Sequence, residues 1–113
     1  FGKLRPAQLG ACSLSELRSA LRSALANGVQ HFVILSHNFE MLKPGRCDPD
    51  SIVVRRFTGL CEFLAAERTA FEVSVLSSTP VIDESPTTRR PIAVKLTDTL
   101  QRHGEQLLRR LTS

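Results

Sequence analysis

One short apolar run constrains the fold of this chain more than any other feature. The segment VQHFVILS, residues 29–36, is rich in β-branched and aromatic residues and is directly followed by His37. Apolar side chains occupy both of its alternating sets of positions, Phe32 with Ile34 and Val33 with Leu35. A strand with two apolar faces needs cover on both of them. The run therefore predicts a strand inside a layered α/β structure, ending at His37.

The residues before this run have the pattern of an amphipathic helix. Ser13 and Glu16 have the spacing of a capping box, in which each side chain bonds the backbone N–H of the other residue. Leucines then recur at helical spacing up to the Asn27-Gly28 pair, which is a typical helix stop. A helix over residues 14–27 is therefore predicted.

A second helix is predicted after a loop that contains Pro44-Gly45. Asp48 followed by Pro49 suits an N-cap with proline at the first helical position. One helical stripe then runs through Arg68 and carries Val53, Phe57, Leu60, Cys61 and Leu64. The charged residues that lie mostly off this stripe are Arg55, Arg56, Glu62 and Glu67. We expect the stripe to pack and these charges to be solvated.

The rest of the chain contains one more strand pattern, a loop and a last helix. Residues 71–76, FEVSVL, alternate apolar and polar side chains, which is typical of a strand near a sheet edge. Residues 78–91 are rich in proline, hydroxyl and charged side chains and are predicted to be a long loop. Within residues 92–113, helical spacing relates Leu96, Leu100, His103, Leu107 and Leu111.

This order of elements predicts an α/β fold. Alternating strands and helices with connections of this length favour a parallel β-α-β-α-β segment with right-handed crossovers, followed by the C-terminal helix. Two or three parallel strands do not make a self-sufficient sheet. We therefore expect residues 1–77 to be the C-terminal part of a distorted (β/α) barrel, with the remainder of the barrel upstream of Phe1 as its partner.

Composition excludes several classes of function. The net charge of +4 comes from scattered arginine pairs, and the chain has no Trp or Tyr, so a nucleic-acid partner is not favoured. No apolar run approaches the roughly 20 residues that span a bilayer, so no membrane partner is expected. The cysteines form no CxxC pair and are odd in number, which slightly favours a reduced, cytoplasmic setting: Cys12, Cys47 and Cys61.

His37 is the first candidate for chemistry, because strand ends carry the catalytic groups of α/β barrels and open sheets. The alternative is that it caps the strand and bonds a loop carbonyl. His31 and His37 lie about 20 Å apart on an extended strand, so they cannot share a metal ion. His103 is expected at the core or its boundary, and Asp83 and Glu84 are weaker candidates in the loop. No metal site made from this chain alone is predicted.

A family resemblance follows from these segments. HFVILSHNFEML, followed by DPDSIVVRRFTGLCEFLAAER and FEVSVL, resembles the closing segment of the polysaccharide deacetylases, the chitin-deacetylase-like carbohydrate esterases. RPAQLGACSLSELRSAL fits the same region, so the resemblance covers Leu4 to Leu76. In that family a late strand ends in a histidine that acts as general acid toward the leaving amine, and His37 is the matching position. Asn38 stands where a different polar residue is common.

The resemblance also implies what this chain lacks. Deacetylation in the family needs a divalent metal, zinc by preference, bound by motifs that would lie upstream of Phe1. The resemblance therefore implies a hydrolase that removes acyl groups from an acylated carbohydrate, with this segment inert alone and holding no cofactor. The alternative is a non-catalytic α/β binding or structural module that docks on a partner through its sheet edge or its last helix.

Overall fold

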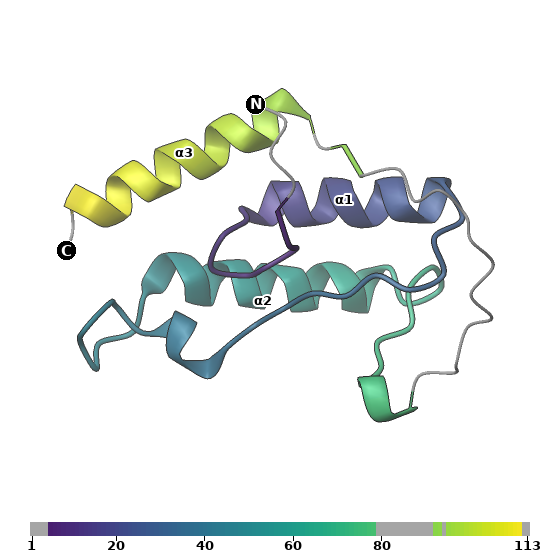
Figure 1. Ribbon diagram of the computed structural model, residues 1–113, viewed down its shortest axis with the longest axis horizontal. Coiled ribbons are helices and arrows are strands. Elements are labelled where there is room, and N and C mark those ends of the chain that lie inside the picture. The colour runs from purple at the N-terminus through teal and green to yellow at the C-terminus, as the bar shows by residue number, and fades with distance from the viewer. Residues whose placement is uncertain (1–4, 79–91, 94, 112–113) are drawn as a thin grey trace.

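The computed structural model describes residues 5–78, 92–93 and 95–111, and this part of the chain is built from three α-helices (Figure 1). The helices are α1 (Leu14–Ala26), α2 (Ser51–Ala66) and α3 (Leu96–Leu111). Two short 3-10 helices, η1 (Asn38–Met41) and η2 (Leu76–Ser78), lie in the connections. β-Pairing in the described residues is limited to two isolated bridges, Gln8 with Leu35 and Leu42 with Pro49.

The α/β prediction is wrong, because the described residues contain no sheet and no part of a barrel. Residues 29–37 are extended, yet the backbone pairs with a neighbouring segment only at Leu35. Its N–H donates to the carbonyl of Ala7 at 2.8 Å, and its carbonyl accepts from the N–H of Leu9 at 3.1 Å. Residues 71–75 also form no strand. Alternation favours an extended backbone, but a sheet also needs neighbouring strands that form backbone hydrogen bonds with it along their length.

The prediction of α1 is confirmed, including its cap. The backbone N–H of Ser13 donates to Glu16 Oε2 at 2.9 Å, and the N–H of Glu16 donates to Ser13 Oγ at 3.2 Å. The helix ends at Ala26, and Gly28 next to it has a φ of 67°. This left-handed backbone suits glycine and stops the helix where the sequence predicted.

The start of α2 differs from the prediction. The N-cap is Asp50 and not Asp48: its Oδ1 accepts from the N–H groups of Ile52 and Val53 at 3.1 and 3.3 Å. Pro49 instead forms the isolated bridge with Leu42, which holds the chain extended up to Asp50. The helix therefore begins two residues later than Pro49.

α1 and α2 lie side by side and run in the same direction (Figure 1). This is possible because the extended residues 29–37 carry the chain from the end of α1 back to the side of the molecule where α2 begins. The core forms between these two helices and the N-terminal segment. Its buried apolar members are Leu9, Cys12, Leu17, Leu21, Ala24, Val53, Leu60 and Phe63. Phe32 and Ile34 pack against this core, whereas Val33 and Leu35 face solvent, so the cover predicted for both faces of the run is present on one face only.

The buried face of α2 is rotated from the predicted stripe. Phe57 and Cys61 are exposed, although the stripe placed them in the core. Arg56, expected in solvent, is buried with 2% of its surface exposed. The side of α2 that faces α1 and the N-terminal segment thus includes a cation, and this cation is central to how α3 docks.

Candidate functional site

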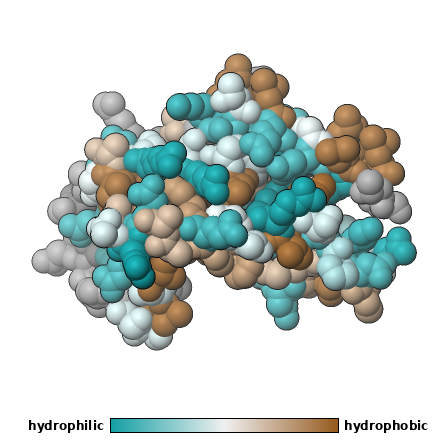
Figure 2. All heavy atoms as spheres, turned by 180° about the vertical axis from the view of Figure 1, so that it is seen from behind, coloured by the Kyte–Doolittle hydropathy of each residue, from teal (hydrophilic) through white to brown (hydrophobic). Residues whose placement is uncertain are grey.

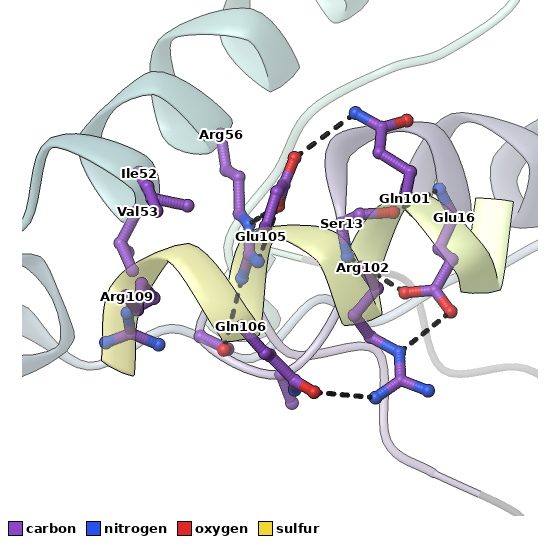
Figure 3. A network of polar contacts seen from close by, with 12 residues as sticks. Ser13, Glu16, Ile52, Val53, Arg56, Gln101, Arg102, Glu105, Gln106 and Arg109 are labelled. Carbon is purple, nitrogen blue, oxygen red and sulfur yellow. Dashed lines mark hydrogen bonds and ion pairs between the residues drawn. The ribbon is translucent and has the colours of Figure 1, made fainter. Parts of the chain in front are cut away.

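α3 contacts the rest of the domain through its polar side. Four residues spaced by four, three and four positions form a charged row on this side: Asp98, Arg102, Glu105 and Arg109. Each of them reaches a polar side chain of α1, α2 or their caps. Figure 3 shows the contacts of Arg102 with Glu16 and of Glu105 with Arg56. The residues of α3 are all at least partly exposed, so apolar burial does not fix this helix.

Glu16 receives the first charged contact. Its side chain is 2% exposed, and Oε1 accepts from Arg102 Nε at 3.2 Å and from Arg5 Nη2 at 2.9 Å. The other oxygen accepts from the N–H of Ser13. One carboxylate therefore caps α1 and also binds two arginines, which are the partners that a buried charge requires.

Arg56 is the second buried charge of the interface. Its Nε and Nη2 donate to Glu105 Oε2 at 2.8 and 2.6 Å. Nη1 donates to the carbonyl oxygens of Leu9 and Gly10, both at 3.2 Å. The guanidinium thus joins α2 to the N-terminal segment and to α3, because its planar fork of N–H groups donates to the carboxylate and to both carbonyl oxygens at once.

The two ends of the charged row are also bound. Arg109 Nη2 lies 2.5 Å from Asp50 Oδ2, which ties the C-terminal half of α3 to the cap of α2. Asp98 Oδ2 accepts from Ser19 Oγ at 2.6 Å, and its carbonyl accepts from Ser13 Oγ at 3.2 Å. The row alternates in sign: Arg102, Glu105 and Arg109 meet charges of the opposite sign, and Asp98 meets serine hydroxyls. This arrangement fixes both the register and the rotation of α3.

The opposite side of α3 carries a leucine face, defined by Leu96, Leu100, Leu107 and Leu111. At 3.6 residues per turn these four side chains fall within an arc of about 60°. Their exposed fractions are 57, 60, 60 and 75%. Figure 2 shows hydrophobic side chains projecting at the outer edge of the molecule on the side where α3 lies. A surface helix of a soluble domain has the reverse orientation, with its apolar stripe toward the core.

The structure places His37 at the end of the extended segment, exposed to solvent. Its ring stacks on Phe39 with a centroid distance of 5.0 Å, and its backbone N–H donates to Glu40 Oε2 at 3.0 Å. The strand that was to carry His37 is absent, and its catalytic role stays a prediction. Asp83 and Glu84 lie outside the described residues.

The other histidines stay apart from His37. His31 is exposed, and His103 is exposed on α3, so the expected core or boundary position of His103 is wrong. The Nε2 atom of His103 lies 3.0 Å from Arg102 Nη2. Among the residues that the structure describes, no group of His, Cys, Asp and Glu could hold a metal ion.

The sequence interpretation missed the buried charges. Arg56 lies three residues after Val53 and four before Leu60, so it shares their helical stripe, and this spacing was available. The alternating signs of the charged row, at helical spacing, were a second signal. Arg56 was expected to be solvated, and the charged row was not recognised.

Comparisons with known proteins identify neither a fold nor a function for this chain. No family model, no curated protein and no solved structure matches this chain. The resemblance to polysaccharide deacetylases is therefore untested, and no evidence supports a hydrolase. None of the helices in the described ranges is long and apolar enough to cross a bilayer.

Proposed function

We propose that this chain is a binding module that docks the leucine face of α3 into an apolar groove on a partner protein. The observation that carries the proposal is the orientation of α3: its charged row is bound to the domain, and the four leucines of its leucine face are exposed to water. Contiguous exposed apolar surface of this kind is typical of interaction sites. Of the two docking routes expected from the sequence, the last helix is the one supported here, since the described residues form no sheet whose edge could dock.

The inward contacts hold the leucines outward. If α3 rotated to bury its leucine face against the domain, Glu16, Arg56 and Asp50 would lose their partners on α3 while remaining covered. Breaking a fully buried ion pair costs about 3–5 kcal/mol, and breaking a surface pair costs at most about 1 kcal/mol. The partners on α3, Arg102, Glu105 and Arg109, are 13, 22 and 26% exposed, so each of the three pairs lies between these limits. The rotation would break all three pairs, and these contacts therefore favour the outward orientation.

The chemistry of α3 favours a protein groove over a lipid surface. Both acidic residues of the helix belong to the charged row, so the charge beside the leucine face is that of Arg110, and Lys95 lies just before the helix. This pattern complements an apolar groove with an acidic rim, the helix-in-groove mode of recognition. A membrane-surface helix instead relies on free basic side chains and aromatic anchors. α3 has no Phe, Tyr or Trp, and Arg102 and Arg109 point to the domain.

The area available is sufficient for specific binding. Four leucines that each contribute about 1.5–3 kcal/mol give a gross gain of about 6–12 kcal/mol. Loss of translational and rotational freedom and side-chain ordering offset a large part of this gain. An affinity in the micromolar range, about −8 kcal/mol, is therefore the expected scale when the rim charges also contribute.

The proposal is tested by photo-crosslinking from the leucine face in extracts of the cells that make the protein. A benzophenone side chain replaces Leu100, and in a matched control it replaces Leu25, a leucine of α1 that is 49% exposed. We expect one crosslinked protein from position 100 and none from position 25. With the purified partner, Leu107→Ser should lower affinity at least tenfold, whereas Leu25→Ser should not.

Three results would contradict the proposal. Equal crosslinking from both positions would show that the adduct reflects exposure and not docking. An adduct with twice the mass of the chain would assign the leucine face to a second copy of the protein. Binding to lipid vesicles that Leu107→Ser abolishes, without a protein adduct, would assign it to a membrane surface.

A further inference from the structure

A groove of about 440 Å³ lies between the C-terminal half of α3 and the start of α2. Its polar lining comes from the loop before α2, from the first residues of α2 and from α3: Lys43, Asp50, Ser51, Gln106, Arg109 and Arg110. Three positive charges and one negative charge give the lining a net charge of +2. This volume is in the range of small-ligand sites.

Two of the cations of this groove belong to parts of the chain that are held by an ion pair or by backbone hydrogen bonds. Arg109 is fixed by Asp50 at 2.5 Å, which also neutralises the one acidic group in the groove. Lys43 lies in a loop closed by two backbone hydrogen bonds, from its N–H to the carbonyl of Asp48 at 2.8 Å and from the N–H of Arg46 to its carbonyl at 3.0 Å. Lys43 and Arg110 therefore approach the groove from two elements that are far apart in the sequence.

We infer that this groove binds a phosphate group, carried by a small molecule or by a lipid headgroup. Phosphate needs several donors that converge from different directions, and the guanidinium, ammonium, hydroxyl and amide groups here supply them. Pro44 and Ile52 add apolar wall next to these donors, which suits the organic part of a phosphorylated ligand. The site is separate from the leucine face, although Arg110 borders both.

Calorimetric titration with pyrophosphate at low salt tests the inference. We expect a dissociation constant of about 0.1–1 mM, weakened about fivefold by Lys43→Gln and by Arg110→Gln, the effect of one partly exposed charge pair. Arg68→Gln is the matched control, since this exposed arginine lies beyond the other end of α2. It should change affinity less than about twofold. Circular dichroism verifies that each variant is folded.

A second arm identifies the source of the phosphate. Phosphatidylcholine vesicles with and without phosphatidic acid replace pyrophosphate, and binding that requires phosphatidic acid and is weakened by Lys43→Gln supports a lipid headgroup. Equal weakening by Lys43→Gln and Arg68→Gln would overturn the inference, because binding would then follow overall charge. Absence of binding to both probes would also overturn it. Leu107→Ser should leave pyrophosphate affinity unchanged, so this result is independent of the docking proposal.

Discussion

Replacing Glu105 by glutamine tests the basis of the proposed docking surface, namely that ion pairs and not apolar packing hold α3. Glu105 Oε2 accepts two hydrogen bonds from Arg56, at 2.8 and 2.6 Å. The substitution Glu105→Gln keeps the size of the side chain and one acceptor oxygen but removes the charge. Arg56 then keeps only the carbonyls of Leu9 and Gly10 and a neutral amide as its partners.

The expected magnitude follows from the burial of the two partners. The Arg56 side chain is 2% exposed and that of Glu105 is 22% exposed. Breaking a fully buried pair costs about 3–5 kcal/mol, and breaking a surface pair costs at most about 1 kcal/mol. This pair lies between the two limits, so we expect a loss of about 2 kcal/mol, equivalent to about a 30-fold change in an equilibrium constant. When α3 opens, water reaches Arg56, so the loss should appear in the opening of α3.

Native-state hydrogen exchange separates this local effect from global unfolding. The amides of α3 should lose about 30-fold in protection in Glu105→Gln, whereas those of α1 should change much less. The matched control is Glu62→Gln, which removes the same charge from an exposed position on α2. Equal losses of protection in α1 and α3, or unchanged protection in α3, would refute the view that this ion pair holds the helix.

Three further predictions concern salt, the core and the cap of α2. Raising NaCl from about 0.1 to 1 M shortens the Debye length from about 10 to 3 Å, so hydrogen exchange should accelerate in α3 before α1. Phe63→Ala should lower the free energy of unfolding by about 3–5 kcal/mol in urea titrations, because Phe63 is buried, whereas Phe39→Ala should change it by less than about 0.5 kcal/mol. Asp50→Asn should retain the cap of α2 but weaken the contact with Arg109. In the same titration it should therefore lower the free energy of unfolding less than Asp50→Ala, which also removes about 1 kcal/mol of capping.

The local elements could be predicted from the sequence because their determinants are local. The capping box of Ser13 and Glu16 and the stop at Gly28 fix α1 without reference to the rest of the chain. The alternation of residues 29–36 likewise separates Phe32 and Ile34 from Val33 and Leu35, but it does not show that only the first two would meet the core. The absence of a sheet from the described residues could not be predicted from local patterns, because pairing depends on which segments meet in space. An extended run paired at one residue and a full strand have the same local pattern.

The outward orientation of α3 escaped prediction for a related physical reason. A leucine row on an amphipathic helix shows which side is apolar, but it does not show what that side faces. The usual outcome is that the leucines turn inward, because burial of apolar surface exceeds the contribution of exposed charges. Here Glu16 and Arg56 are themselves buried in the α1–α2 pair and require opposite charges, which the charged row of α3 supplies, together with Arg5 in the case of Glu16. The orientation of α3 was therefore encoded in α1 and α2.

This division of roles gives α3 a specific advantage as a docking element. The helix is already formed and oriented by the charged row, so a partner that covers the leucine face does not have to order it first. An isolated helix of 16 residues is only marginally stable in water, and ordering it on binding would reduce the affinity. Conversely, a partner in place adds apolar contacts to a helix that has no buried residue of its own. Partner binding and the packing of α3 on the domain are therefore expected to stabilise each other. Variants of Glu105 should lower the affinity for the partner, although this residue faces away from the leucine face.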